Sequence, residues 1–547
     1  MREPTFASYR SPVLARRGLT ASSQPLASQA GLALLQQGGT AADAAVAMAA
    51  ALNVTEPTST GLGGDCFALY FDAATGAVTA LNGSGRAPAG LSSGLIRAQG
   101  LAAGAEIADP YHAHTVTVPG ACAGWCDLIA RHGARPLAEV LAPAIRLAED
   151  GFPVTPLTSY FWSRSAERLA RTPGGAAFTL SGRGPRPGEI FRNPGLARTL
   201  RAVAEGGAAA FYQGAIARAI ARRVQAAGGV LAEADLAAHT STWDEPLSVA
   251  YHGLRVWECP PNGQGLTALL ALNILEGFGL AGLDPFAPRR WHLLIEALRA
   301  AFADARWYVA DPAFAPVPLA GLLSPAYAAE RRRLIDPERA TLDIRRGAPV
   351  GASGTVYLCA VDGQGNACSF INSNYMGFGT GLVPEDEAGR SWGFTLQNRG
   401  HNFVLDPEHP NALQPGKRPY HTIIPGMLTR ADGTLYGPFG VMGGFMQPQG
   451  HVQVAVGLAD DGLDPQAALD RPRFCIDDGR AGGTVLLEAG LPAELVEDLR
   501  RRGHPLRAEI GGYARAAFGR GQIIRRDPDG VLWGGSDPRA DGCAMGF

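Results

Sequence analysis

With 547 residues, 46% of them hydrophobic, the chain is long enough to bury one large core or two cores that share an interface. Its 48 Lys and Arg residues against 50 Asp and Glu residues give a formal net charge of -2, which excludes a whole-molecule field that attracts nucleic acid or an anionic membrane. The eight cysteines form no Cys-x-x-Cys pair, and the histidines show no zinc-ligand spacing. We therefore expect a globular protein that recognises its ligand locally, with no nucleic-acid partner, no metal and no other cofactor.

The N-terminal segment shows no targeting pattern. Residues 1–20 contain arginines but no apolar run long enough for a signal peptide, and no later segment reaches the length of a membrane span. The sequence therefore predicts a cytoplasmic protein without a membrane partner.

The first part of the chain is mainly helical in pattern. Helical spacing over residues 23–54 is interrupted by Gly38-Gly39, which predicts two helices joined by a tight turn. A pair of strands is expected at 67–71 and 78–81. Amphipathic spacing then predicts a helical layer, with helices over 137–149, 194–205, 215–227, 266–276 and 292–308.

The pattern changes near the middle of the chain. Residues 331–354 are rich in Arg, Asp, Pro and Gly without periodicity, which predicts an exposed, cleavable linker. Short strands are expected after it, at 355–361, 367–372, 423–429, 434–439, 522–526 and 531–533, with helices at 452–459 and 465–470. Strands flanked by helices in sequence indicate a layered α/β architecture.

Two glycine-containing motifs are set aside. Residues 90–94 fit the Gly-x-Ser-x-Gly nucleophile elbow, but Pro88-Ala89 stand where that motif requires a strand. The glycine clusters at 377–381 and 443–444 lack the Lys-Ser/Thr sequel of a phosphate-binding loop, so a nucleotide site is not expected.

Thr355 is the candidate nucleophile. It follows Gly354 and begins an apolar, strand-like run. If the chain is cut before Thr355, this residue holds both a hydroxyl and a free amine to deprotonate it. Such an amine has a reference pKa of about 7.7–8.0, which suits a general base near neutral pH. A Gly-Thr pair at a strand start is most often a turn exit, so the catalytic interpretation depends on the other motifs.

Several separate blocks carry a resemblance to the γ-glutamyltransferase family of N-terminal-nucleophile hydrolases. The resemblance spans nearly the whole chain, because the blocks occur in the same order from the N-terminal helices to the C-terminus. These blocks are 37–47, Glu56-Pro57, 61–65, 85–88, 118–120, 260–265, Glu296-Ala297, Asp311-Pro312, the Thr355 segment, 416–419, Gly443-Gly444 and 536–542.

The resemblance implies a fold and a processing event. The fold would be a four-layer αββα sandwich, made as a proenzyme that cuts itself before Thr355. The products would be two interlocked chains, a large subunit of residues 1–354 with the helical layers and part of the sheets, and a small subunit of residues 355–547. The resemblance leaves open whether two such heterodimers associate into a dimer.

The resemblance also implies roles for individual residues. Thr355 would attack the substrate carbonyl, and Ser373 would hydrogen-bond the nucleophile, although an ordinary strand serine is an equal alternative. Gly443 and Gly444 would supply backbone N–H groups to an oxyanion hole, where side chains would block close approach. Arg86 would pair with a substrate carboxylate, a task suited to guanidinium geometry.

The departures from the family pattern concern substrate recognition. Tyr375 stands where γ-glutamyl enzymes have an asparagine, and Asn402 stands where they have the acid that holds the substrate α-ammonium. Arg399 replaces a neutral amide, and His421-Thr422 replace a serine pair. The site would thus lose its anion and gain cationic or aromatic groups. The alternative for Arg399 and His421 is a pair of solvated loop residues.

These substitutions resemble a subgroup that includes oxamate amidohydrolase and glutaryl-cephalosporin acylase-like enzymes. We expect an amidohydrolase or acyltransferase that cleaves an amide of a small, carboxylate-bearing acyl group through a Thr355 acyl-enzyme. A glutathione hydrolase or γ-glutamyl transpeptidase is the alternative among enzymes. An uncleaved, non-catalytic binding protein on the same scaffold is the alternative from another class.

Overall fold

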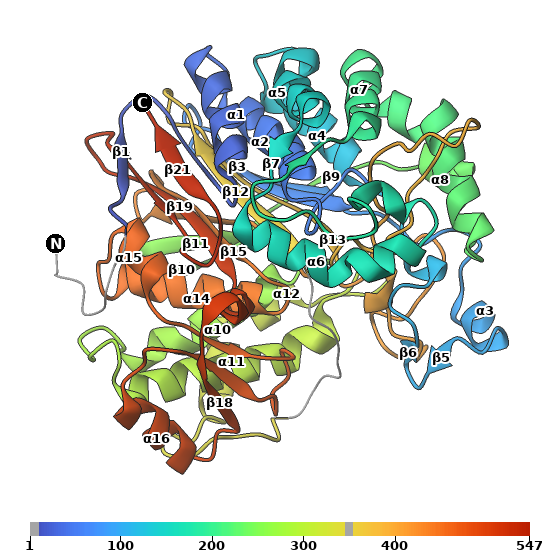
Figure 1. Cartoon of the computed structure of the whole chain (residues 1–547). Coiled ribbons are helices and arrows are strands. Elements are labelled where there is room, and N and C mark those ends of the chain that lie inside the picture. The colour runs from blue at the N-terminus through green and yellow to red at the C-terminus, as the bar shows by residue number, and fades with distance from the viewer. Residues whose placement is uncertain (1–9, 345–353) are drawn as a thin grey trace.

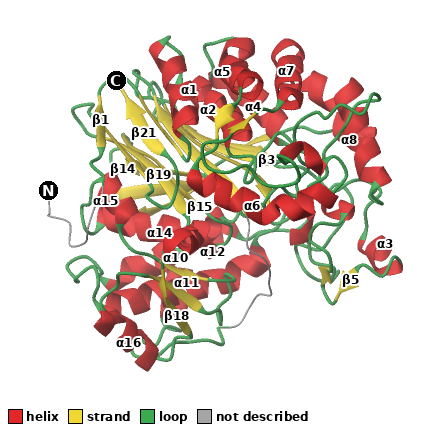
Figure 2. Ribbon diagram, in the orientation of Figure 1, coloured by secondary structure: helices red, strands yellow, loops and turns green. Residues whose placement is uncertain are grey.

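The computed structural model describes residues 10–344 and 354–547 (Figure 1). Two seven-stranded sheets pack face to face in the middle of the molecule, and helices cover the outer face of each (Figure 2). This arrangement is the predicted four-layer αββα sandwich.

Every strand pair in the two large sheets is antiparallel. The first sheet has the order β1 (Val13–Ala15), β20 (Leu532–Ser536), β19 (Arg520–Arg526), β15 (Leu435–Met442), β14 (Gly426–Arg430), β11 (Leu254–Glu258) and β10 (Leu247–Tyr251). The second sheet has the order β21 (Cys543–Gly546), β2 (Leu19–Ser22), β12 (Gly354–Val361), β13 (Ala367–Tyr375), β3 (Asp65–Phe71), β4 (Val78–Gly83) and β9 (Thr242–Asp244).

Two groups of helices form the outer layers. The second sheet is covered by α1 (Pro25–Gln36), α2 (Ala41–Thr55) and α4 (Ala121–His132), with α5 (Leu137–Asp150) packed on α2 and α7 (Pro194–Tyr212) packed on α5 and α4. The first sheet is covered by α10 (Gly265–Leu275), α14 (Met446–Ala459) and α15 (Pro465–Asp470), with α11 (Pro288–Tyr308) packed on α10.

The remaining elements lie outside these layers. A small sheet of β16 (Phe474–Ile476), β17 (Val485–Glu488) and β18 (Leu506–Ile510) lies beside α16 (Ala493–Arg501). The others are α3 (Ser93–Ala98), β5 (Ala102–Ala103), β6 (Glu106–Ile107), β7 (Phe152–Pro153), α6 (Pro156–Arg171), β8 (Ile190–Phe191), α8 (Gly214–Ala226), α9 (Glu233–Ala237), α12 (Leu319–Leu322) and α13 (Pro325–Arg332).

Helix α2 shows how composition produces the sandwich. All of its residues are buried, and most are alanines, whose small side chains let the helix pack closely on β12 and β13. Its N-terminus is closed by a capping box in which Thr40 and Asp43 bond each other's backbone N–H groups. A fully buried helix needs such a cap, because its first N–H groups have no access to water.

The linker prediction is partly wrong. Helix α13 extends into the predicted segment, and Ile335 and Ile344 are buried rather than exposed. The Thr341 N–H donates to the Glu296 carboxylate at 2.9 Å, so this stretch is held against α11. The rest of the predicted linker, 345–353, lies outside the described residues.

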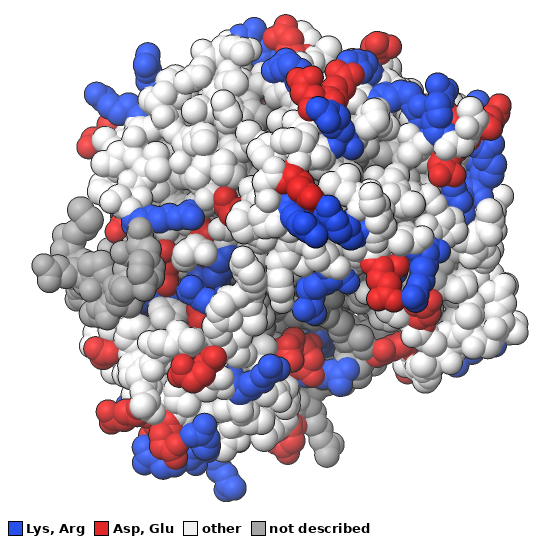
Figure 3. Space-filling model, viewed as in Figure 1, with Lys and Arg blue, Asp and Glu red and all other residues white. Residues whose placement is uncertain are grey.

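The surface agrees with the balanced composition. On the face shown in Figure 3, basic and acidic side chains are interspersed. Across the described ranges, no helix combines the length and apolar character that crossing a bilayer requires.

Candidate active site

Thr355 lies at the start of β12, a central strand of the second sheet. Its side chain is fully buried. The Thr355 hydroxyl donates to Ser373 Oγ at 3.2 Å, and Gln447 Nε2 donates to Thr355 Oγ1 at 3.4 Å. The structure thus brings the predicted nucleophile and the predicted second hydroxyl together across the β12–β13 pair.

Arg399 is the charged group beside this hydroxyl pair. It begins a short 3-10 helix, Arg399–Asn402, and is fully buried. It donates to Thr422 Oγ1 at 2.6 Å and to Ser373 Oγ at 3.2 Å, and its guanidinium carbon lies 4.3 Å from the centroid of the Tyr375 ring. Burial lowers the pKa of Arg399 to about 10, so the side chain stays protonated at neutral pH.

The Arg399 charge lacks a close counterion. Within the described part of the chain no carboxylate is in hydrogen-bond contact with it, and its Nε has no hydrogen-bond partner. Asp65 acts on it at longer range. A buried cation without a paired anion is costly, so the site is suited to an anionic ligand.

Tyr375 and Asn402 form one polar unit at the end of β13. The Tyr375 hydroxyl donates to Asn402 Oδ1 at 2.5 Å, and Asn402 Nδ2 donates to the Tyr420 carbonyl at 3.0 Å. Tyr375 has a φ of 77°, which is rare outside glycine and which turns its ring under Arg399. Burial raises the pKa of Tyr375 to about 12, so the unit is uncharged. It offers no anion to a substrate ammonium.

His421 forms a hydrogen bond with Asp65 and carries no positive charge near pH 7. Its Nε2–H donates to Asp65 Oδ2 at 2.9 Å, and burial lowers the pKa of His421 to about 3, so it is neutral near pH 7. Burial alone would raise the pKa of Asp65, but bonds from His421 and Gln397 and the Arg399 charge keep it below its usual value. Of the cationic or aromatic groups expected here, His421 therefore supplies an aromatic ring and no positive charge near pH 7. The solvated alternative is wrong, since His421 and Arg399 are fully buried.

Gly443 and Gly444 form the turn between β15 and α14. Their φ values are 135° and 62°, in the region that side chains rarely adopt. Gln264 Nε2 donates to the carbonyls of Gly444, at 2.8 Å, and Thr422, at 2.6 Å, which ties this turn to the Arg399 contacts. The turn lies at the positive end of the α14 dipole, a favourable place for a developing negative charge.

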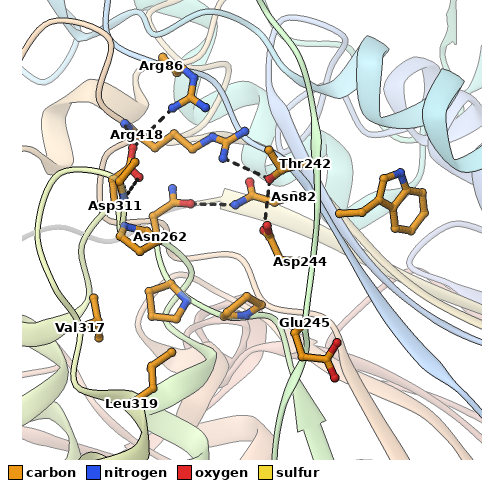
Figure 4. A pocket seen from close by; sticks show the side chains of 15 residues that line it. Asn82, Arg86, Thr242, Asp244, Glu245, Asn262, Asp311, Val317, Leu319 and Arg418 are labelled. Carbon is orange, nitrogen blue, oxygen red and sulfur yellow. Dashed lines mark hydrogen bonds and ion pairs between the residues drawn. The ribbon is translucent and has the colours of Figure 1, made fainter.

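Arg86 lines a cavity of about 530 Å³ whose lining includes neither Thr355 nor Arg399 (Figure 4). One Arg86 nitrogen lies 3.6 Å from Asp311 Oδ2, and the side chain is 34% exposed. The Arg418 N–H also donates to Asp311, at 2.9 Å. Arg86 is thus paired within the protein and is not brought into contact with the Thr355 cluster.

Several site residues received no role from the sequence. Asp65 and Gln264 lie in blocks that carried the resemblance, and Gln397 begins the segment that contains Arg399. Gln397 Nε2 donates to Asp65 Oδ1 at 2.9 Å, and the Gly85 and Gly120 N–H groups donate to the same oxygen at 3.0 and 3.1 Å. The available signal for Asp65 was an acidic residue directly after the glycine pair Gly63-Gly64. Gln447 had no such signal.

A second cluster of buried titratable groups joins α11 to the residues that follow α16. His292, Glu296 and His504 could bring metal-ligating atoms together, although no metal was expected from histidine spacing. His292 Nδ1 and His504 Nε2 are 2.8 Å apart. Arg299 Nε lies 3.4 Å from Glu296 Oε1, and this fixed positive charge opposes a cation there. Sequence spacing missed the cluster because His504 lies far along the chain.

A four-layer αββα sandwich with a threonine hydroxyl at the head of a central strand defines the class of N-terminal-nucleophile hydrolases. The family model described as gamma-glutamyltranspeptidase matches residues 27–547, and the chain belongs to this family.

Known relatives cover almost the whole chain. The chain is 37% identical to the glutathione hydrolase-like YwrD proenzyme of Bacillus subtilis, covering 98% of this chain and 99% of that protein. It is 34% identical to the oxamate amidohydrolase proenzyme of Klebsiella pneumoniae, covering 97% and 98%. The crystal structure of a cephalosporin acylase from Bacillus halodurans superposes with a TM-score of 0.91 at 46% identity, covering 100% and 99%.

These relatives confirm the predicted family, the N-terminal-nucleophile fold and the enzyme class. The chain is an amidohydrolase, a hydrolase acting on C–N bonds. The non-catalytic binding protein is therefore set aside.

Proposed function

We propose that this enzyme hydrolyses an amide whose small acyl group carries a carboxylate, with Thr355 as nucleophile and Arg399 as the carboxylate partner. The observation that carries the proposal is the fully buried Arg399 guanidinium, which contacts Ser373 and Thr422 but no carboxylate among the described residues. A substrate carboxylate would supply the missing anion within reach of the nucleophile.

The neutral groups of the site support the same substrate class. Asn402 and Tyr375 satisfy each other and are uncharged, so a substrate α-ammonium would keep its desolvation cost there. Relatives named oxamate amidohydrolase and cephalosporin acylase act on amides. Oxamate itself is an amide whose acyl part ends in a carboxylate.

The reaction would proceed through an ester on Thr355. Its α-amine takes the hydroxyl proton as Oγ1 bonds to the substrate carbonyl carbon, and the Gly443 and Gly444 N–H groups bind the oxyanion. The C–N bond then breaks, and the leaving amine takes the proton from the α-ammonium. Water next attacks the ester carbon as the α-amine takes a proton from it, the C–Oγ1 bond breaks, and Oγ1 takes that proton from the α-ammonium.

The same hydroxyl would first attack the carbonyl of Gly354 and divide the chain into 354 residues and the remaining 193 of 547. Strands β12 and β13 lie between β2 and β3, so the small chain would stay inserted in the sheet of the large chain. Such fragments of one precursor would remain interlocked. The relatives from Bacillus subtilis and Klebsiella pneumoniae are both named as proenzymes, which supports this processing.

The first test is cleavage of the purified protein. A denaturing gel should show two bands, and Edman sequencing of the smaller should begin Thr-Val-Tyr-Leu-Cys. Thr355→Ala should fold but stay uncut and inactive. Another N-terminus, or an active Thr355→Ala chain, would overturn the assignment of the nucleophile.

The second test compares acyl groups with one leaving group. We expect a higher kcat/KM on a glutaryl anilide than on the γ-glutamyl anilide, which differs only by the α-ammonium, and measurable hydrolysis of oxamate. A preference for the γ-glutamyl anilide would favour the glutathione-hydrolase alternative, to which the relative at 37% identity points. Loss of that preference in Asn402→Ala would assign the ammonium contact to Asn402.

A further inference from the structure

We infer that Gln447 is a catalytic residue, whose side-chain amide donates to Thr355 Oγ1 and stabilises the negative charge that forms there when the acyl-enzyme breaks down. This inference rests on the proposed role of Thr355. It adds a donor on the nucleophile oxygen itself, distinct from the Gly443-Gly444 donors that would bind the substrate oxygen.

The orientation of the Gln447 amide is determined by its two contacts. Gln447 is the second residue of α14 and is fully buried. Its Oε1 accepts from the Ile424 N–H at 2.9 Å, which only an oxygen can do, so Nε2 must face Thr355 Oγ1, at 3.4 Å. A hydrogen bond of this length is weak in the resting site and can tighten as charge develops.

A comparison within α14 separates this contact from a structural one. Gln449, two residues later, is also fully buried, but its amide bonds partners outside the Thr355 cluster: the Phe445 carbonyl, the Cys475 sulfur and both backbone groups of Ile476. Gln447 instead directs its donor to the hydroxyl of the nucleophile. Both side chains are buried amides on one helix, so packing alone does not explain the difference.

The chemistry places the largest effect on the second half of the reaction. During attack, a donor on Oγ1 stabilises the hydroxyl before its proton leaves, so it helps little. During breakdown of the ester, the C–Oγ1 bond breaks, the electron pair passes to Oγ1, and the oxygen then takes a proton. Hydrogen bonds to charged oxygens are worth about 1.5–3 kcal/mol, which corresponds to roughly 10- to 100-fold in deacylation rate.

The test uses Gln447→Leu, which removes both contacts, and Gln447→Glu, which keeps an acceptor for Ile424 but removes the donor. With a glutaryl anilide, stopped-flow burst amplitude and rate report acylation, and the steady-state rate reports deacylation. We expect the burst rate to stay within a few-fold of wild type and the steady state to fall about 10- to 100-fold. The glutaryl ester should accumulate on the 193-residue chain, seen as added mass.

A variant that does not mature remains informative. Self-cleavage also passes through an ester on Oγ1, so an arrested variant should hold that ester between Gly354 and Thr355. Hydroxylamine, which cleaves esters under conditions that leave amides intact, should then divide it into the two fragments. An arrested chain that resists hydroxylamine would overturn the inference.

Gln449→Leu is the matched control, since it removes a buried amide from the same helix. It should lower Tm while leaving the ratio of burst to steady-state rate unchanged. If Gln447→Leu behaves in the same way, or if both Gln447 variants keep wild-type deacylation, Gln447 is structural and the inference fails. Failure of the proposed function would look different. A Thr355→Ala chain that stays active would show that Thr355 is not the nucleophile.

Discussion

Arg399 and Arg86 are two arginines with similar expected tasks and different surroundings. Arg399 is fully buried beside Ser373, stacks on Tyr375, and has no ion pair with a described carboxylate. Arg86 is one-third exposed in a cavity and is paired with Asp311. The resemblance assigned the substrate carboxylate to Arg86, whereas the contacts favour Arg399.

The difference lies in which charge is already compensated. A substrate carboxylate at Arg86 would have to compete with Asp311, and an exposed ion pair is worth only about 0–1 kcal/mol either way. At Arg399 it would relieve the cost of a buried, uncompensated cation close to the nucleophile. Substitutions of Gly444, Arg399, Arg86 and His421, with matched controls, test this comparison.

Gly444→Ala gives the largest expected effect and serves as the reference, because the oxyanion forms with every substrate. Turnover should fall about 10²–10³-fold on acyl groups with and without a carboxylate. Stability should fall by about 1–2 kcal/mol, because Gly444 has a φ of 62°. Near-normal turnover would place the oxyanion hole elsewhere.

Arg399→Met should lower kcat/KM about 10²-fold on a glutaryl anilide and much less on a butyryl anilide, because only the first carries a carboxylate. Arg306→Met is a matched control. Arg306 is also buried and stacked, on Phe445, and bonds the backbone carbonyl of Gly479. It should lower stability without changing acyl preference. An equal loss on both anilides in Arg399→Met would show that Arg399 only positions Ser373.

Arg86→Met should raise KM by less than about tenfold, since this arginine is already paired with Asp311. Arg86→Lys, which loses bidentate geometry, should act in the same direction. Asp311→Asn sharpens the comparison. If Arg86 binds the substrate, releasing it from Asp311 should lower KM. Arg86→Met should then lower kcat/KM on the glutaryl anilide as much as Arg399→Met does. That result would support the role implied by the resemblance.

Local patterns predicted the parts of the fold that depend on local interactions. Strands were expected at 355–361 and 367–372, and the structure pairs them as β12 and β13 through a turn in which Asp362 Oδ1 accepts from the backbone of Gln364 and Asn366. Helix α14 begins at Met446, earlier than the predicted 452, because the buried side chains of its first turns are largely polar and hide the apolar period.

The site was predictable only where a motif was contiguous. Thr355 and the Gly443-Gly444 turn lie within single blocks, and the strand expected from residue 355 is present as β12. The catalytic roles of these residues stay predictions. The Asp65–His421 pair joins residues 356 positions apart, and no spacing rule reports such a contact. Burial of Arg399 was also invisible in sequence, because an arginine in a loop is usually solvated.

The smallest expected effect concerns the free energy of unfolding. It comes from the His421–Asp65 pair, whose carboxylate acts on Arg399 at longer range. The pKa of His421 is about 3 in the folded protein against an ordinary value of 6.5, so its stabilising effect is present above pH 6.5 and is lost as pH falls toward 3. Between pH 7 and 5 the unfolded chain takes up a proton at this position and the folded chain does not, which costs about 2 kcal/mol. His421→Gln removes that difference.

The measurement is urea unfolding at pH 7 and pH 5 in the uncut Thr355→Ala background, where the two fragments cannot separate. His421→Gln should be less stable than its parent at pH 7, because Asp65 loses the bond from His421. Its free energy of unfolding should nevertheless fall by about 2 kcal/mol less than that of its parent between pH 7 and pH 5. Parallel losses in the two chains would mean that His421 is protonated in the folded state. The Asp65 pair would then be an ion pair, and His421 would be a second cation beside Arg399.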